Sequence, residues 1–279
     1  MAHARSVRAT IWTYDAGQVR PRRDSLVTEE PLEIRLQAGG ERRRIGLTMR
    51  TPGADFELAA GLLLAEGIVQ QPHEIARISY CVDSDLSEEQ RYNAVTVALR
   101  APQFPELSAL ERHFSAGSAC GVCGKTSVDA LHMRGCQPLP HGTPVDPQVL
   151  SQLPGALRDA QQVFESTGGL HAAGLFSRNG DVLAVREDVG RHNALDKLVG
   201  WAFLNRRVPL GDTIAMLSGR ASYELLQKAV VAGIPIVCSV SAPSSLAVDV
   251  ARAYGVTLVG FVRGERYNVY SWPERLFIQ

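Results

Sequence analysis

The sequence has no excess of either charge. Its 279 residues include 29 lysines and arginines and 29 aspartates and glutamates, so the formal net charge is zero. General nucleic-acid binding rests on clustered positive charge, and this balance argues against it. Only three of the basic residues are lysines. The arginine bias is typical of genome composition, so each arginine is judged by its neighbours.

Long hydrophobic runs are also missing. The longest uncharged run, residues 229–248, contains two prolines and four serines, which fits a helix–strand–helix passage better than a membrane span. The first 15 residues are polar and show no secretory signal. We therefore expect a cytoplasmic protein without membrane contact, whose five cysteines stay reduced.

The first hundred residues predict a strand-rich unit. Gly39 and Gly40 separate two apolar segments, which favours a hairpin. Apolar positions between residues 56 and 68 predict a helix with Thr51 and Asp55 as candidate caps. The expected strands are 7–14, 32–36, 44–49, 75–82 and 94–99.

Glycine and proline dominate the middle of the chain. A short helix over about residues 106–114 is expected before the glycine-rich segment SAGSACGVCGKTS, and five prolines between 138 and 154 indicate a linker. We place the domain boundary there. The N-terminal domain spans 1–143 and ends in the cysteine loop and linker, and an α/β domain spans 144–279.

From residue 160 the pattern becomes regular. Strands at 170–176 and 182–187 flank Asn179 and Gly180, which is a type I′ turn signal. Helices over 192–205, 222–232 and 244–254 are expected to alternate with strands over 213–217, 234–239 and 257–262. This order predicts a mixed α/β sheet with helices on both faces.

Cys120 and Cys123 lie in the segment CGVCGK, and three chemistries fit them. In thiol transfer, one cysteine is a thiolate whose pKa Lys125 lowers. In redox chemistry the pair forms a disulfide, although that motif normally follows a strand in a βαβ unit. In a zinc site, His132 and Cys136 would complete the ligands, but their H-x-x-x-C spacing is unusual. Thiol chemistry is favoured over metal binding.

Two further cysteines, Cys81 and Cys238, lie in apolar strands, where we expect them to be buried and inert. Zinc-dependent deamination is excluded by two absences. No histidine or cysteine is followed two positions later by glutamate, and Cys120 follows alanine instead of proline.

A polar cluster at residues 186–197 follows an expected strand and begins a helix. Arg191, His192 and the helix N-terminus could form an anion pocket. Alternatively, Asp188 caps the helix while Asp196 and Lys197 lie on a solvated face. The residues alone leave both interpretations open.

Two further polar residues, His171 and Arg220, also lie at the ends of expected strands. His171 follows a glycine pair at a strand start, where a satisfied core histidine is the commoner role. Arg220 lies between a strand and a helix, where α/β folds place ligands, and could bind a phosphate. Helix capping by Ser222 is the structural alternative.

The segment FVRGER ends the last expected strand and suits a nucleotide. Phe261 could stack on a base, Glu265 could accept base N–H groups, and Arg263 and Arg266 could hold phosphates. A charged surface turn would explain the same residues.

Five segments together resemble the formate dehydrogenase accessory sulfurtransferase family. The segment from Glu187 is long enough to be specific, and we find no departure at the motif positions. The segments are CGVCGK, TGGLHAAGL, EDVGRHNALDKLVG, SGRASYE and LVGFVRGER.

The resemblance implies a cytidine-deaminase-like α/β fold with a smaller strand-rich α+β N-terminal domain. It implies a homodimeric sulfurtransferase that takes persulfide sulfur from a cysteine desulfurase. The sulfur passes to the molybdenum cofactor, molybdenum bis(molybdopterin guanine dinucleotide), of formate dehydrogenase. No permanent cofactor or metal is expected.

The resemblance also implies residue roles. Cys120 would carry the persulfide and Cys123 could assist, while Arg191, His192 and Arg220 could add walls to the cofactor site. A zinc-stabilised chaperone that only binds the cofactor is the alternative function, and a general thiol oxidoreductase is the third. The segment that would bind the cofactor comprises Phe261, Val262, Arg263, Gly264, Glu265 and Arg266.

Overall fold

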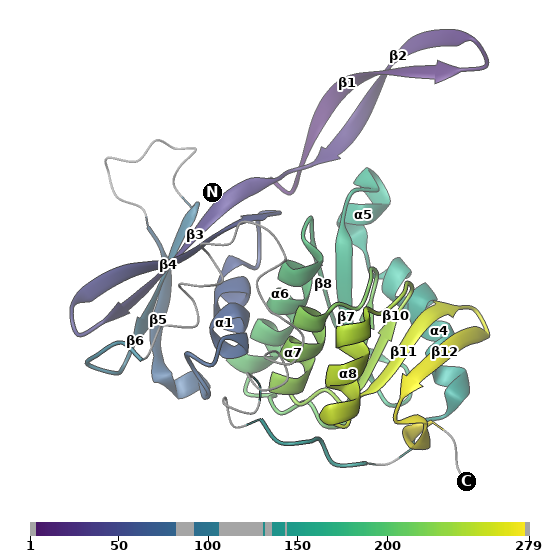
Figure 1. Ribbon diagram of the computed structural model, residues 1–279. Coiled ribbons are helices and arrows are strands. Elements are labelled where there is room, and N and C mark those ends of the chain that lie inside the picture. The colour runs from purple at the N-terminus through teal and green to yellow at the C-terminus, as the bar shows by residue number, and fades with distance from the viewer. Residues whose placement is uncertain (1–3, 82–91, 106–130, 132–135, 143, 277–279) are drawn as a thin grey trace.

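The computed structural model describes residues 4–81, 92–105, 131, 136–142 and 144–276, arranged as three sheets with helices around the largest one (Figure 1). Cys120, Cys123, His132 and the helix expected over 106–114 lie outside the described residues. The mixed α/β class is confirmed, whereas the cytidine-deaminase-like detail and the boundary at residue 143 stay predictions.

The N-terminal part builds a four-stranded sheet in the order β4-β3-β6-β5. Neighbouring strands are antiparallel except for β3 and β6, which run parallel. The predicted hairpin at Gly39 and Gly40 is confirmed, because β3 pairs with β4 across it. The elements are β3 (Glu30–Ala38), β4 (Glu41–Arg50), α1 (Asp55–Ala65), the 3-10 helix η1 (Pro72–Glu74), β5 (Ile75–Tyr80) and β6 (Ala94–Leu99).

The C-terminal part builds a six-stranded mixed sheet in the order β12-β11-β10-β9-β7-β8. Strands β9, β10 and β11 run parallel, and the other neighbours are antiparallel. Its elements are α4 (Pro147–Asp159), α5 (Gln162–Thr167), β7 (His171–Ser177), β8 (Val182–Asp188), α6 (Arg191–Leu204), β9 (Thr213–Leu217), α7 (Tyr223–Val231), β10 (Ile236–Ser239), α8 (Ser245–Ala253), β11 (Thr257–Arg263), β12 (Arg266–Ser271) and η2 (Pro273–Arg275).

Helices cover both faces of this sheet, as predicted. Side chains alternate along a strand, so Ile214 and Met216 pack with α4 while Ala215 and Leu217 pack with α6, α7 and α8. Because both faces are covered, the central strands are buried throughout, which is why they read as continuous apolar runs.

Helices α1 and α6 cross with their backbones in contact, and this crossing joins the two large sheets. A Cβ at Gly61 would overlap the carbonyl oxygen of Asp196, and a Cβ at Gly200 would overlap that of Glu57. The buried residues of both helices belong to one apolar cluster that reaches from β3 to β11. The two sheets therefore share a hydrophobic core.

Residues 6–27, which the sequence analysis left unassigned beyond one strand, form a long two-stranded hairpin. Strand β1 (Ser6–Asp15) pairs with β2 (Gln18–Val27) along its whole length, and the pair extends away from the rest of the protein (Figure 1). Its base contacts the body, where Arg5 lies 3.9 Å from the Glu187 carboxylate. In the described part, no helix combines the length and hydrophobicity needed to cross a membrane.

Three local predictions are wrong. The β7–β8 turn is not type I′, because Gly180 alone of the turn residues has a positive φ (89°), which fits a type I turn followed by a left-handed glycine. Helix α1 has no side-chain cap, since Asp55 instead binds Arg50 at 3.0 Å. The proline-rich linker ends in a helix, α4, which starts at Pro147 and contains Pro154.

The same substitution should have opposite effects in two helices. Gly200→Ala forces α1 and α6 apart, so we expect the free energy of unfolding to fall by about 3 kcal/mol. A Cβ at Gly155 in α4 would have no neighbour within 4 Å. Because alanine has the higher helix propensity, Gly155→Ala should raise the free energy of unfolding by up to about 1 kcal/mol. Urea denaturation measures both, and equal effects would contradict the helix crossing.

Candidate functional site

The strand directions bring the predicted polar segments to one edge of the six-stranded sheet. Strands β9, β10 and β11 are parallel, so their carboxyl ends meet there. The end of β8 lies at the same edge, because Asp188 pairs with His171 at the start of antiparallel β7. We call this the carboxyl edge, and ligands of α/β sheets bind at such edges.

Hydrogen bonds hold the loops of the carboxyl edge against one another. The Ser239 hydroxyl donates to the carbonyl oxygen of Gly219 at 2.5 Å, and the amide of Ser244 donates to that of Ala221 at 2.9 Å. The amide of Phe261 donates to the carbonyl oxygen of Ser241 at 3.1 Å. The loops after β9 and β10 therefore form one continuous surface with β11.

The 261–266 segment spans a tight turn, as its surface-turn alternative expected, and this turn leads into strand β12, which the sequence analysis missed. Phe261 sits in a bulge of β11 with a left-handed φ of 55° and a ring that is 36% exposed. Val262 is buried in the core below α4, whereas Arg263, Glu265 and Arg266 are exposed. A strained, exposed aromatic residue beside two arginines suits a ligand-binding surface.

Two helix N-termini lie beside this surface. Helix α6 begins after Gly190 and α7 after Ser222, and neither has a side-chain cap, so the predicted cap at Ser222 is wrong. Arg191 packs against Gly219, and its buried Nε has no hydrogen-bond partner among the described residues. Two helix N-termini without a side-chain cap and a guanidinium Nε without a partner in the described part together suit an anion.

Both histidines of the edge are held neutral. Burial, followed by the nearby Arg191 charge, lowers the pKa of His171. Burial lowers the pKa of His192 to about 4, although Glu224 at 3.0 Å opposes the shift. His192 Nε2 also lies 3.2 Å from the Ser222 hydroxyl. The sequence analysis missed this contact. The alternation of strands and helices could have indicated it, because that order places the starts of α6 and α7 at the same edge of the sheet.

The alternative role of the 186–197 cluster, a capping aspartate and a solvated face, is wrong. Asp188 and Lys197 are 0% and 1% exposed, with their charged groups 2.6 Å apart. Burial lowers the pKa of Lys197, which also donates to the Thr51 carbonyl oxygen at 2.8 Å. Asp196 is buried too and binds Lys228. The cluster thus fixes the start of α6 against the N-terminal sheet.

The two cysteines that the sequence predicts to be buried are buried in the structure. Cys81 and Cys238 are buried, and burial raises the pKa of the Cys238 thiol far above its usual value. Cys238 is therefore unsuited to thiolate chemistry, whereas the Cys81 sulfur accepts a hydrogen bond from the Arg35 guanidinium at 3.4 Å. Cys120 and Cys123, the predicted reactive pair, lie outside the described residues, and in the described part no three histidine, cysteine or acidic side chains group as metal ligands.

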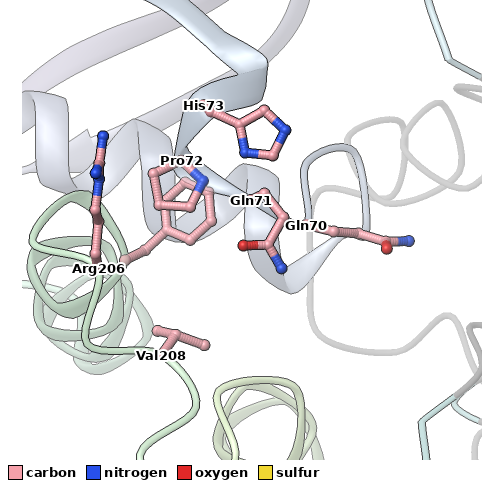
Figure 2. A pocket seen from close by; sticks show the side chains of 7 residues that line it. Gln70, Gln71, Pro72, His73, Arg206 and Val208 are labelled. Atoms are coloured by element: carbon pink, nitrogen blue, oxygen red, sulfur yellow. The ribbon is translucent and has the colours of Figure 1, made fainter.

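A separate cavity of about 270 Å³ lies at the far end of α6 (Figure 2). Its lining residues are Gln70, Gln71, Pro72, His73, Phe203, Arg206 and Val208. Helix α6 has 14 residues and is about 21 Å long, so this cavity is remote from the carboxyl edge. It contains none of the predicted site residues.

Comparison with known proteins identifies the family of the chain. The profile of the FdhD/NarQ family matches residues 27–277. The chain belongs to the FdhD/NarQ family. The match includes the whole carboxyl edge, and it confirms the resemblance predicted from the five segments. Most of the β1–β2 hairpin precedes the matched region.

Relatives and one solved structure extend the match over nearly the whole chain. A Nocardia farcinica protein named sulfur carrier protein FdhD is 50% identical over 276 residues, covering 99% of this chain and 94% of its own. The Mycobacterium tuberculosis protein of that name is 48% identical, covering 94% and 95%. A Desulfotalea psychrophila structure described as a formate dehydrogenase accessory protein is 26% identical with a TM-score of 0.75, covering 98% and 100%.

Proposed function

We propose that this protein is a sulfur carrier in the maturation of formate dehydrogenase. The observation that carries the proposal is the carboxyl edge, where an exposed Phe261 and two arginines lie beside two uncapped helix N-termini in an FdhD/NarQ family chain. The relatives named sulfur carrier protein FdhD support the same role.

The cargo that fits the carboxyl edge is the molybdenum cofactor in its bis(molybdopterin guanine dinucleotide) form. Its guanine could stack on Phe261, and Glu265 could accept hydrogen bonds from the base. Its phosphates suit Arg263, Arg266 and the partnerless Nε of Arg191. Val262 cannot touch the cargo through its side chain, because that side chain is buried, so its role is to anchor the turn.

Sulfur transfer is assigned to Cys120. Its thiolate attacks the outer sulfur of a persulfide on a cysteine desulfurase, so one S–S bond forms as another breaks and the desulfurase thiolate leaves. Cys120 then holds the persulfide. The Cys123 thiolate, as the assisting thiol, attacks the Cys120 sulfur, so a Cys120–Cys123 disulfide forms, the S–S bond of the persulfide breaks and the outer sulfur leaves as sulfide to ligate the molybdenum of the cargo. This chemistry makes the protein a sulfurtransferase, and its need for reduced thiols suits the cytoplasm.

The protein is further proposed to act as a homodimer. Trp12 and Tyr14 are 70% and 74% exposed on the projecting hairpin, which is too slender to be stable without a partner surface. Other exposed apolar side chains lie on β4 and β8, each of which is one of the two edge strands of its sheet. A second copy could cover hairpin and edge strands in one two-fold contact.

The first prediction concerns the thiol. Incubation with a desulfurase and cysteine should add one sulfur to the peptide containing Cys120, detected by mass spectrometry. Cys120→Ala should lose that sulfur and reduce formate dehydrogenase activation to background, because the persulfide is assigned to this thiol. Cys136→Ala is the matched control and should retain both. Full activation by Cys120→Ala would refute the assignment.

The second prediction concerns the guanine nucleotide. Arg263→Ala should weaken GDP binding about tenfold or more, the cost of a lost hydrogen bond to a charged group, in isothermal titration calorimetry. Arg252→Ala removes an exposed arginine at the other end of α8 and should leave binding unchanged. Equal affinities for wild type and Arg263→Ala would remove this arginine from the site.

The third prediction concerns the hairpin. Light scattering should give the mass of a dimer for the wild type at micromolar concentration. The double variant Trp12→Glu/Tyr14→Glu should dissociate at least tenfold more readily, because charges would enter the apolar contact. A wild-type monomer, or a variant dimer of unchanged strength, would show that the hairpin has another role.

A further inference from the structure

A single buried hydroxyl lies between the loops of the carboxyl edge. Strand β10 ends at Ser239, which is fully buried and follows three apolar residues. Ser239 pairs with Leu217 at the end of parallel β9, which brings it beside the loop that follows β9. A hydroxyl that is removed from water needs hydrogen-bond partners within the protein. The partners of this one connect two loops.

The Ser239 hydroxyl donates to the carbonyl oxygen of Gly219 at 2.5 Å and accepts from the amide of Ser241 at 3.1 Å. The carbonyl oxygen of Ser241 also lies 3.1 Å from it. A hydroxyl has only one proton to donate, and the shorter contact, to Gly219, takes it. Ser239 therefore links the loop after β9 to the loop after β10.

Each of the two linked loops touches one half of the proposed nucleotide site. Gly219 lies against His171 and Arg191, since a Cβ at this glycine would be 3.3 Å from the imidazole Nδ1 and 3.8 Å from the arginine Cδ. The carbonyl oxygen of Ser241 accepts the amide of Phe261 at 3.1 Å. Arg191 is assigned to a phosphate and Phe261 to the base, so the hydroxyl connects the supports of both.

Phe261 needs such a support. Its φ of 55° is left-handed, and a residue with a side chain keeps this conformation only where its surroundings fix it. One contact that fixes it is the hydrogen bond to Ser241, whose own amide is held by Ser239. The position of the Phe261 ring thus depends on the same hydroxyl as the position of Gly219.

We infer that Ser239 is a positioning residue, which sets the separation between the base half and the phosphate half of the nucleotide site. A ligand that spans both halves binds more tightly when they are held at the right separation before it arrives. Ser239 does not touch the ligand itself, because it is fully buried. The inference rests on the proposed function, which places Phe261 and Arg191 in the site.

The test measures GDP affinity by isothermal titration calorimetry. Ser239→Ala should bind GDP about fivefold more weakly than the wild type, because the two halves are no longer held in place. The variant should still fold, since the backbone hydrogen bonds of Ala221 with Ala242 and Ser244 continue to join the loops. If circular dichroism shows it unfolded, Ser239→Cys takes its place, because a thiol is only a weak donor.

Ser271→Ala is the matched control. Ser271 is also buried, donates to the carbonyl oxygen of Val256 at 2.8 Å and accepts from the amide of Leu258 at 3.1 Å. It therefore makes the same pair of hydrogen bonds as Ser239, but near the start of β11, away from Phe261. Ser271→Ala should lose similar stability in urea and bind GDP as the wild type does.

A second measurement separates positioning from a general loss of stability. Arg191→Ala should weaken GDP binding about tenfold in the wild-type background, the cost of a lost hydrogen bond to a charged group. In the Ser239→Ala background it should cost less, because the guanidinium is already displaced from the phosphate, whereas in Ser271→Ala it should cost the full amount.

The outcomes distinguish this inference from the proposed function. An unchanged GDP affinity of Ser239→Ala, or an equal cost of Arg191→Ala in all three backgrounds, would overturn the role of Ser239 and leave the nucleotide site standing. A wild-type protein that does not bind GDP would overturn both.

Discussion

The backbone contact between α1 and α6 is the constraint on which the rest of the structure depends. Gly61 and Gly200 let the two helices approach until only hydrogen atoms separate their backbones. Helix α1 packs against the four-stranded sheet and α6 against the six-stranded sheet. The crossing therefore joins the apolar residues under both sheets into one hydrophobic core. A side chain at either glycine would separate the sheets and move the start of α6, where Arg191 and His192 lie.

The buried ion pairs around this crossing set position more than stability. Lys197 and Asp188 are fully buried, and the desolvation of such a pair offsets much of its attraction. Their value lies in geometry, because they and Thr51 connect the loop after β4 to the first turns of α6. The N-terminal sheet thereby fixes the orientation of residues that face the carboxyl edge.

Two surfaces of opposite preference meet at His192. The carboxyl edge presents uncapped helix N-termini and arginines, which favour an anion, while the cavity between the two large sheets presents the Glu224 carboxylate, which favours a positive charge. A charged imidazole between them would weaken the second preference. Burial keeps His192 neutral, so both surfaces can coexist within one turn of α6.

Local patterns predicted most of the C-terminal half. Its parallel strands are apolar throughout because both faces are covered, and its helices alternate with them at short intervals. The patterns failed where side chains pair across elements. Asp196 and Lys197 read as a solvated helix face, because nothing near them in the chain shows that Lys228 and Asp188 would bind them. Strand β12 was also missed, and it pairs with β11 across a bulge that includes Phe261.

The sequence by itself determined the mixed α/β class, most strand and helix positions and the five segments that indicate the family, because these rest on local periodicity and on residue identity. Only the tertiary structure decided which segments meet at the carboxyl edge and which charges are buried. Those features depend on contacts between residues far apart in the chain, such as Thr51 with Lys197. Local sequence patterns do not show which distant residues will be in contact.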